Sequence, residues 1–278
     1  MPKVSVVLPV YNGEIFLEES IKSILNQTYK DFELIIVDDN STDSSGVIAQ
    51  KYAKEHSNVI YTKNEKNLKL PAALNKGFSL ASGEYFTWIS DDNIHFPNML
   101  ARLVEELEKD PEIGLVYFDI EIIDENGKNI GYKKVGPNEG LIFRNVVGAC
   151  FLYRSALDKK IGGYNESMFL VEDYEYWLRL ALATKIKAVN ECLLQYRRHP
   201  KSLSNQFDKE VRAKGIKMKK KYLKLYSLPR KQMARFYAYL IFRDKFNPFR
   251  IKYAFCGLYY SPSAFLKQIY DVVKQHYK

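Results

Sequence analysis

The chain has 278 residues, of which 46% are hydrophobic and 27% charged, enough apolar material for a full buried core. Its net charge of +9 is uneven: residues 208–278 carry 18 Lys and Arg against 4 Asp and Glu, whereas residues 1–207 carry 24 against 29. No apolar run reaches the ~20 residues of a membrane span, no signal-peptide pattern opens the chain, and three scattered cysteines (Cys150, Cys192, Cys256) exclude a disulfide framework and predict buried free thiols in a reducing cytoplasm.

The first ninety residues alternate between strand and helix patterns. Apolar runs predict strands over 4–8, 32–37, 58–62 and 84–89, and periodic apolar positions predict helices over 14–26, 42–55 and 72–80. Asn12 is a candidate cap of the first helix. Strands and helices that alternate at this spacing predict an α/β fold with a doubly wound, mostly parallel sheet and helices on both faces.

The pattern changes after residue 95. Residues 115–123 and 130–135 flank an Asn126-Gly127 turn, which predicts a small antiparallel hairpin. We further expect a strand over 146–153, a helix over 172–183 and a strand over 186–196. Together with the charge shift, this divides the chain into a domain of residues 1–207, with halves 1–95 and 96–207, and a helical basic extension of residues 208–278.

Two of the predicted strands end in paired carboxylates, Asp38-Asp39 and Asp91-Asp92. Ligands of a parallel sheet bind beyond the carboxyl ends of its strands, where the strand order reverses. Adjacent aspartates repel each other, and a hard divalent cation accepts their oxygens readily. Capping explains either pair alone equally well, but two pairs at equivalent strand ends favour a shared cation site.

The loop after the first strand, residues 9–13, contains neither a G-x-G-x-x-G nor a Walker pattern. This absence argues against a dehydrogenase and against a kinase. A bound diphosphate would then be neutralised mainly by a metal ion, which suits Asp91 and Asp92.

Three blocks of the sequence resemble family 2 glycosyltransferases of the GT-A fold, nearest to the bacterial polysaccharide and spore-coat type. The family's N-terminal signature is matched in this chain by V-S-V-V-L-P-V-Y-N-G and by S-I-L-N-Q-T-Y-K-D-F-E-L-I-I-V-D-D-N-S-T-D. Its second block resembles A-L-N-K-G-F-S-L-A-S-G-E-Y-F-T-W-I-S-D-D-N, and its third block resembles E-D-Y-E-Y-W-L-R-L. The resemblance covers residues 3–204. It implies a cell-surface polysaccharide enzyme that moves a sugar, with inversion, from a nucleotide diphosphate sugar, with UDP favoured, to a saccharide or lipid-linked saccharide acceptor.

The resemblance also assigns roles to residues. It implies a nucleotide-binding half over 1–95 and an acceptor-binding half over 96–207. Asp39 would accept a hydrogen bond from the imino N–H of the base, and Asp91 would contact the ribose or metal-bound water. The full nucleotide-binding set comprises Pro9, Tyr11, Asp39, Asn67 and Asp91.

The same resemblance makes Asp92 the ligand of a Mn²⁺ or Mg²⁺ ion that bridges the diphosphate. The family's usual first Asp of D-x-D falls at Ile89 or Ser90, so few protein ligands remain. Water and phosphate oxygens would complete the metal's shell, and metal affinity without nucleotide should be weak.

Asp173, in the pair Glu172-Asp173, matches the family's catalytic base, with Glu172 as the alternative. Inverting transfer is one in-line displacement, and a carboxylate must remove the proton of the attacking hydroxyl. Acidic residues in a first helical turn also stabilise the helix start by themselves. Both roles are compatible, because a helix N-terminus is a rigid mount.

The stretch Tyr196-Arg197-Arg198-His199 resembles the family's lid over the diphosphate, in which Arg197 or His199 would face phosphate or metal. His199 is thus a second candidate metal ligand. A plain basic loop leaving the last strand is the alternative. Residues 148–150 lie where related enzymes shape the acceptor pocket, although a small-residue core strand fits them equally well.

The basic extension also holds 15 Phe and Tyr. One predicted helical face carries Met233, Phe236, Tyr237, Leu240 and Ile241. A basic helix with such a face suits an anionic membrane surface, which predicts a cytoplasmic protein held peripherally on the inner face of the cell membrane. Packing on the catalytic domain or in a homodimer is the alternative, and nucleic acid is disfavoured because the aromatics follow helical periodicity.

Two other classes of function compete with the glycosyltransferase. A nucleotidyltransferase-like enzyme would need a Gly-rich, basic N-terminal loop, and the sequence shows none. A non-catalytic nucleotide-sugar or membrane-binding module would be favoured if the pair Glu172-Asp173 were missing, and both carboxylates are present.

Overall fold

The computed structural model describes residues 1–244 and 250–276 and divides the chain into two compact units. The first unit contains residues 1–141 and 145–206, and the second contains residues 142–144 and 207–278. The predicted halves 1–95 and 96–207 of the catalytic part stay a prediction. No helix in the described part of the chain is both long and apolar enough to cross a membrane.

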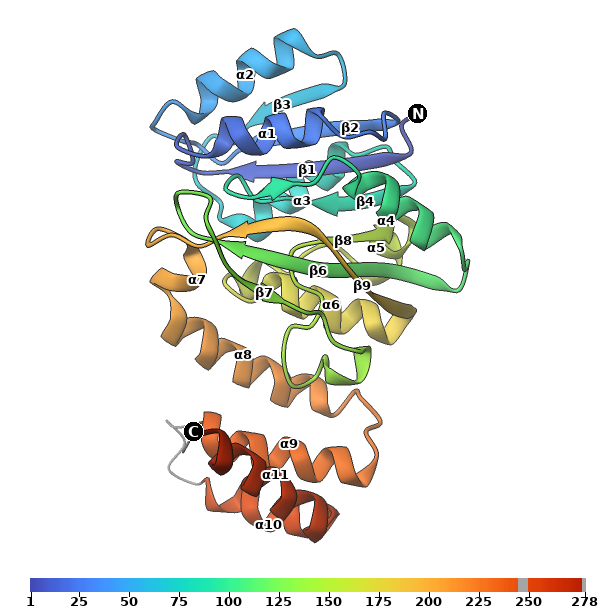
Figure 1. Ribbon diagram of the computed structural model, residues 1–278, viewed down its shortest axis with the longest axis vertical. Coiled ribbons are helices and arrows are strands. Elements are labelled where there is room, and N and C mark those ends of the chain that lie inside the picture. Colours follow the sequence, from blue (N-terminus) through green and yellow to red (C-terminus); the bar gives the residue numbers. More distant parts are fainter. Residues whose placement is uncertain (245–249, 277–278) are drawn as a thin grey trace. The chain divides into compact units, whose positions relative to one another are not determined.

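The first unit begins with alternating strands and helices (Figure 1). In chain order these are β1 (Val4–Val10), α1 (Leu17–Leu25), β2 (Phe32–Asp38), α2 (Ser45–Glu55), β3 (Val59–Lys63), α3 (Leu70–Leu80) and β4 (Tyr85–Trp88). Apolar runs that are buried along their whole length form β1 and β2, as a strand covered on both faces requires. Each predicted strand and helix of this region is present, with boundaries shifted by a few residues.

The remainder of the first unit adds strands of both directions. It contains β5 (Ile94–His95), α4 (Met99–Glu108), β6 (Ile113–Ile123), β7 (Asn129–Lys133), η1 (Asn138–Gly140), β8 (Phe151–Arg154), α5 (Ala156–Ile161), η2 (Glu166–Met168), α6 (Glu172–Ala183), β9 (Lys185–Arg197) and α7 (Leu203–Gln206). The predicted hairpin is β6–β7, and the predicted helix over 172–183 is α6. The elements β5, α4, η1, α5, η2 and α7 were not predicted.

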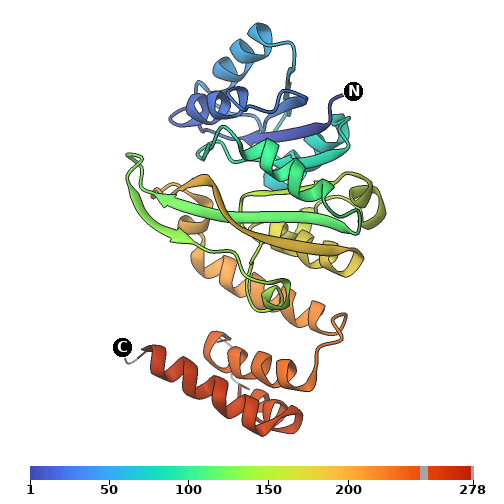
Figure 2. The same cartoon turned by 45° about the vertical axis from the view of Figure 1, so that its right-hand side comes forward.

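All strands join one sheet in the order β3-β2-β1-β4-β8-β6-β9-β5, with β7 on β6. The pairs β2–β3, β1–β2, β1–β4 and β6–β9 are parallel, while β8 is antiparallel to both β4 and β6. Strands β1, β2, β3, β4, β6 and β9 therefore run in the same direction, and the long β6 and β9 lie side by side in Figure 2. The strand order reverses between β1 and β4, which marks the ligand crevice of such a sheet.

Helices cover both faces of the sheet. Side chains of α1, α2 and α4 share one apolar core with alternate residues of β1, such as Val6 and Leu8. Helix α3 packs on the other face, so closely that a Cβ on Gly77 would lie 2.3 Å from Val7 Cγ1. Only glycine permits this approach of helix to strand, and the doubly wound architecture is confirmed.

Two local predictions were wrong. The strand expected over 146–153 begins only at Phe151, because residues 145–150 form a loop in which Gly148 has a positive φ of 74°. The three thiols are free, but only Cys150 is buried, whereas Cys192 and Cys256 are half-buried.

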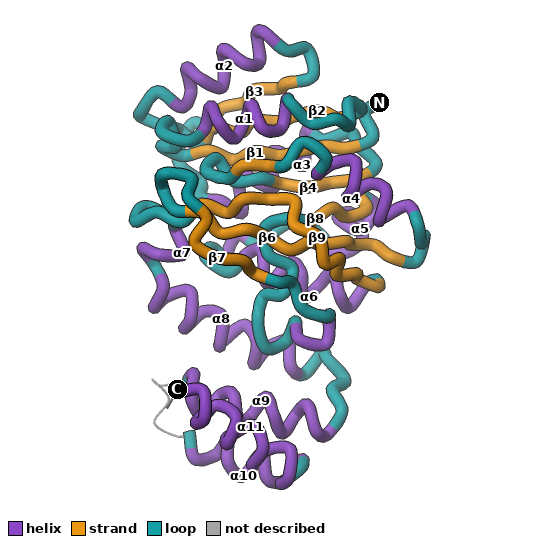
Figure 3. The backbone as a smooth tube through the Cα atoms, in the orientation of Figure 1, coloured by secondary structure: helices purple, strands orange, loops and turns teal. Residues whose placement is uncertain are grey.

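The second unit is helical, as Figure 3 shows by its colouring. Its helices are α8 (Asp208–Leu223), α9 (Arg230–Arg243), α10 (Ile251–Tyr260) and α11 (Pro262–His276). Ala234 and Ala238 of α9 form a small core with Ala264 and Phe265 of α11. On the predicted apolar face of α9, Phe236 and Leu240 are buried, whereas Met233, Tyr237 and Ile241 are half-buried.

Candidate active site

The carboxyl ends of β1, β2, β4, β6 and β9 lie at one edge of the sheet, toward which the arrowheads of β1 and β6 point on the left of Figure 1. Pro9 is buried in β1 opposite Val37, so it can offer only backbone to a ligand. Tyr11 follows with 49% of its surface exposed, and its ring is available for contact.

Two turns at this edge are fastened to each other. Asn12, at a positive φ of 55°, accepts a hydrogen bond from Thr42 N (2.9 Å) and donates its own N–H to Ser41 Oγ (3.1 Å). Gly13 N donates to Ser45 Oγ (2.9 Å). Asn12 therefore does not cap α1 as predicted, because its side chain is committed to the β2–α2 turn.

Asp39 organises the loop that leads into α3. Its carboxylate, 3% exposed, accepts hydrogen bonds from Asn64 Nδ2 (2.8 Å), Leu68 N (2.9 Å) and Lys69 N (2.8 Å). Asn67 lies in the same loop, where its Oδ1 accepts from Lys69 N (3.1 Å). A carboxylate has about four acceptor positions, so one remains for an outside donor such as the imino group of a base.

Asp38 has a structural role instead. It is fully buried and accepts hydrogen bonds from Ser41 N (2.7 Å) and Tyr61 Oη (3.0 Å), with Lys63 Nζ 3.6 Å away. Because Asp38 is buried and bonded to these protein donors, we expect a cation at this edge to rely on Asp91 and Asp92, and a cation site shared by both aspartate pairs stays a prediction.

Asp91 lies against the β1–α1 turn. A Cβ on Gly13 would fall 1.9 Å from Asp91 Oδ2, so this contact exists only because residue 13 is glycine. Burial, reinforced by the neighbouring carboxylate of Asp92, raises the pKa of Asp91 to about 7. A nearby cation would stabilise the charged form of both carboxylates and lower this pKa.

Asp92 is paired with His199, which reaches it from the loop after β9. Asp92 Oδ2 lies 3.0 Å from His199 Nε2, and the two side chains are 19% and 14% exposed. Carboxylate oxygen and imidazole nitrogen are both ligands that Mn²⁺ accepts. Within residues 1–244 and 250–276, no group of three or more His, Cys, Asp or Glu is placed to hold a metal. The pair therefore suits an ion whose remaining ligands come from a nucleotide diphosphate and water.

Arg197, the other candidate lid residue, is bonded to several protein groups. Its side chain is buried and donates to Asp92 O (3.0 Å), Glu125 O (3.1 Å) and Glu19 Oε2 (2.5 Å), with the guanidinium 4.5 Å from the centre of the Phe16 ring. The guanidinium thus joins α1, the Asp92 loop and the β6–β7 turn. Of the two predicted lid residues, His199 faces Asp92, and contact of Arg197 with a diphosphate stays a prediction.

Asp173 lies in the first turn of α6. Its Oδ2 accepts a hydrogen bond from Asn145 Nδ2 (2.8 Å), and its Oδ1 accepts one from Tyr174 N (2.6 Å). Burial raises the pKa of Asp173, while these two donors and the nearby Lys133 act in the opposite direction. The neighbouring Glu172 is 5% exposed, so Asp173 is the more accessible carboxylate of the pair.

Strand pairing brings Asp173 to the same edge as the aspartates. Because β8 is antiparallel to β4, with Phe86 opposite Tyr153, the loop of residues 145–150 lies beside the carboxyl end of β4. Ring contacts continue the connection, from Trp88 to Phe151 (5.9 Å between centroids) and from Phe151 to Trp177 of α6 (4.5 Å). The nucleotide-binding set, the Asp92–His199 pair and Asp173 thus border one edge.

Sequence reasoning missed Asn145 and Glu19 as partners of the predicted residues. Asn145 is 28 positions from Asp173, and Glu19 is 178 positions from Arg197. Only the polar character of Asn145 within an apolar stretch hinted at a role.

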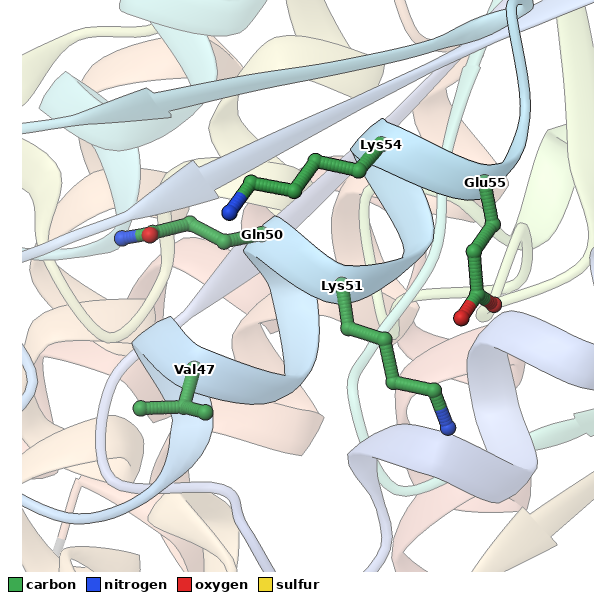
Figure 4. A pocket seen from close by; sticks show the side chains of 5 residues that line it. All are labelled: Val47, Gln50, Lys51, Lys54 and Glu55. Carbon is green, nitrogen blue, oxygen red and sulfur yellow. The ribbon is translucent and has the colours of Figure 1, made fainter.

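A shallow depression elsewhere on the first unit has no connection to these groups. It is lined by Val47, Gln50, Lys51, Lys54 and Glu55, all from α2, as Figure 4 shows. None of these five residues belongs to the strand edge described above.

Comparison with known proteins agrees with this geometry. The model of the family "Glycosyl transferase family 2" matches residues 5–162. An uncharacterized glycosyltransferase of Methanocaldococcus jannaschii is 34% identical over 209 residues, covering 70% of this chain and 71% of that protein. An uncharacterized glycosyltransferase of Rickettsia typhi is 32% identical over 215 residues, covering 73% of this chain and 66% of that protein, so the chain spans just under two thirds of its length.

Among solved structures, S. aureus TarS 1–349 in complex with UDP-GlcNAc is similar in fold. The TM-score is 0.64 at 16% sequence identity, and the match covers 98% of this chain and 92% of that chain. The GT-A fold expected from the sequence is therefore confirmed.

Proposed function

Because the chain belongs to glycosyl transferase family 2, we propose that it transfers a sugar from a UDP-sugar, with inversion and with a divalent metal, to a saccharide or lipid-linked saccharide of the cell surface. The observation that carries the proposal is the common strand edge that holds Asp39, the Asp92–His199 pair and Asp173. The UDP-GlcNAc complex of the structurally similar TarS supports a UDP-sugar as donor.

The donor nucleotide would lie over the carboxyl ends of β1 and β2. Asp39 keeps one acceptor position for the N3–H of uracil, and the exposed ring of Tyr11 can pack on the base. Asn67 and Asp91 would contact the ribose. A pyrimidine with an imino N–H fits this arrangement. A buried carboxylate oxygen without a donor costs free energy, and the imino N–H would supply that donor.

Asp92 and His199 would hold the divalent ion, Mn²⁺ or Mg²⁺. When bound, such an ion offsets the negative charge of the departing diphosphate without any proton transfer. Arg197 donates a hydrogen bond to the backbone carbonyl of Asp92 and would help to fix that residue in place. With few side-chain ligands, the protein alone would bind the ion weakly.

Asp173 would act as the base. The acceptor hydroxyl oxygen forms a bond to the anomeric carbon, the bond from that carbon to the diphosphate oxygen breaks, and the hydroxyl proton passes to the Asp173 carboxylate. Burial raises the pKa of Asp173, which makes the carboxylate a stronger base, and general-base assistance contributes on the order of 10²- to 10⁴-fold. The hydrogen bonds from Asn145 Nδ2 and Tyr174 N would fix the orientation of this carboxylate.

The test compares Asp173→Asn with Glu172→Gln. We expect Asp173→Asn to lose at least 100-fold in sugar transfer, or in hydrolysis of UDP-GlcNAc when water is the acceptor, with UDP affinity by calorimetry unchanged within about twofold. Glu172→Gln should keep most of the activity. Near wild-type turnover by Asp173→Asn would show that another group is the base.

We also propose that the second unit contacts an anionic membrane, which would place the enzyme peripherally on the inner face of the cell membrane. Since Phe236 and Leu240 of α9 are buried, the contact would come from α10, where Ile251, Phe255 and Tyr259 are spaced four residues apart and are each at least 68% exposed. Lys252 and Arg250 lie beside them, and basic residues next to exposed aromatics suit anionic headgroups.

Vesicle binding tests this contact. The double variant Phe255→Ser/Tyr259→Ser should lose sedimentation with phosphatidylglycerol vesicles at low salt, while Val47→Ser, an equally exposed apolar residue of α2, should not. Wild-type protein that ignores these vesicles, or that proves to be a dimer in which Phe255 is buried, would contradict the membrane assignment.

A further inference from the structure

Asn75 of α3 binds the backbone of a segment that precedes the proposed base. Its Oδ1 accepts a hydrogen bond from Tyr164 N (2.7 Å), and its Nδ2 donates to Tyr164 O (2.9 Å). One amide side chain thus satisfies both backbone groups of one residue, as a neighbouring strand would. Asn75 Nδ2 also lies 3.3 Å from Glu166 Oε1. The contact is tight, because a Cβ on Gly163 would fall 2.6 Å from Asn75 Oδ1.

Helix α6 holds the same segment, residues 161–171, from the other side. Arg179 donates from Nη1 to Ile161 O (2.8 Å) and from Nη2 to Gly163 O (2.8 Å). Tyr164 stacks on Tyr176 with the ring centroids 4.2 Å apart and the planes at 11°. The 161–171 segment is therefore clamped between α3 and α6.

The clamped segment leads directly to Asp173. Its penultimate residue, Leu170, has a φ of 81°, a left-handed conformation that a branched side chain adopts only when its surroundings enforce it. Val171 follows, and α6 starts at Glu172. The position of the Asp173 carboxylate thus depends on how the 161–171 segment is held.

The N-terminal end of α3 follows the loop that Asp39 holds through the backbone N–H groups of Leu68 and Lys69. Lys69, immediately before α3, donates its backbone N–H to Asp39 Oδ2 (2.8 Å). Its Nζ also lies 6.0 Å from the centre of the Phe169 ring in the 161–171 segment. Helix α3 is therefore anchored to Asp39 at its start and to the segment before Asp173 one and a half turns later.

Resting on the proposed role of Asp173, we propose that Asn75 is a positioning residue, which fixes the distance between the nucleotide held at Asp39 and the base by binding the backbone of Tyr164. It touches neither donor nor acceptor. The single helix α3 would position both the loop around Asp39 and the segment before Asp173. A bound donor sugar would therefore meet a carboxylate that is already in place.

The test uses Asn75→Ala and Asn75→Asp. The alanine removes both hydrogen bonds. The aspartate keeps the size and the acceptor for Tyr164 N but places a carboxylate against Tyr164 O and Glu166, so it covers the case in which the alanine does not fold. Lys76→Ala, on the exposed face of the same helix, is the matched control.

We expect both Asn75 variants to lower kcat for release of UDP from UDP-GlcNAc by about 10- to 100-fold, since a displacement of ~1 Å costs this much, while the Kd for UDP changes less than about twofold. Backbone amide exchange in residues 161–171 should accelerate, and Lys76→Ala should match wild type in all three measurements. A merely structural role would instead lower UDP affinity and kcat together or leave kcat untouched.

Two results would overturn the proposal. Faster exchange of the 161–171 segment with an unchanged kcat would show that the segment does not position the base, and unchanged exchange would show that Asn75 does not hold it. Failure of the proposed function is distinguishable, because it appears as full activity of Asp173→Asn.

Discussion

Replacement of Arg197 by methionine tests how much the buried guanidinium contributes to the first unit. Methionine keeps the length of the side chain and its contact with Phe16 but removes every N–H donor. Two backbone carbonyls, Asp92 O and Glu125 O, lose a charged donor in a buried setting. Hydrogen bonds to charged groups contribute ~1.5–3 kcal/mol each.

The ion pair with Glu19 adds little, because the Glu19 side chain is 54% exposed and can be hydrated when its partner is removed. Two lost carbonyl contacts predict a destabilisation of at least about 3 kcal/mol. A domain of this size shifts its melting temperature by ~2–4 °C per kcal/mol, so Arg197→Met should melt about 6–12 °C lower.

Fluorescence is a suited probe, because both tryptophans of the chain, Trp88 and Trp177, belong to the first unit. Arg198→Met is the control, since Arg198 is exposed, and it should melt within about 1 °C of wild type. Arg197→Lys should fall between, because an ammonium cannot reproduce the planar fork of donors. If Arg197→Met melts like wild type, or if Arg198→Met is destabilised equally, the assigned contacts do not stabilise the unit.

Three further outcomes follow from the site. Gly13→Ala places a methyl group 1.9 Å from the present position of Asp91 Oδ2, so the carboxylate must move. Calorimetry should then show UDP binding weakened about tenfold, which corresponds to the loss of roughly one hydrogen bond. Unchanged affinity would remove Asp91 from the nucleotide site. Because the pKa of Asp91 is raised to about 7 from an unfolded value near ~3.9, the folded protein binds the extra proton in this range, and in EDTA its stability should fall as the pH rises from about 4 to about 7. Asp91→Asn lacks this slope and should melt higher than wild type at pH 8 but equally at pH 4, whereas parallel pH curves would contradict the shift. EDTA should weaken UDP binding by wild type, and Asp92→Ala should abolish the effect of Mn²⁺ on that binding, with His199→Ala intermediate; an Asp92→Ala protein that still responds to Mn²⁺ would place the ion elsewhere.

Local patterns predicted most of the fold, because the apolar residues that become buried are contiguous or periodic within short stretches of the sequence. Strands such as β1 and β2 are apolar along their whole length, and the helix α6 has the predicted bounds. The errors lie where a distant partner decides. Val146 and Val147 look like a strand, yet the neighbouring Asn145 reaches Asp173 and the chain turns at Gly148.

The candidate site shows the same division. The aspartates at the strand ends could be predicted, because parallel strands bring their carboxyl ends to one edge. The protein partners of these residues could not. Nothing near Arg197 in the sequence indicates that it bonds Glu19 and the backbone of Asp92. Nothing near Asp38 indicates that the distant Tyr61 donates a hydrogen bond to it.

The apolar face of α9 illustrates why periodicity alone cannot name a partner. Phe236 and Leu240 recur with helical spacing, which suits a membrane and a helix neighbour equally. The structure buries them in protein. Among the described residues of the second unit, the exposed aromatic side chains belong instead to α10 and α11.

The fastening of the β1–α1 turn to the β2–α2 turn bears on how a ligand would be received. Ordering the backbone of a loop costs ~1–2 kcal/mol per residue, and a flexible loop meets this cost when its ligand arrives. In the free protein, Asn12 is already bonded to Ser41 and Thr42, and Gly13 is bonded to Ser45. A nucleotide would therefore meet a preorganised platform, so its affinity would not be reduced by the entropy of freezing these turns.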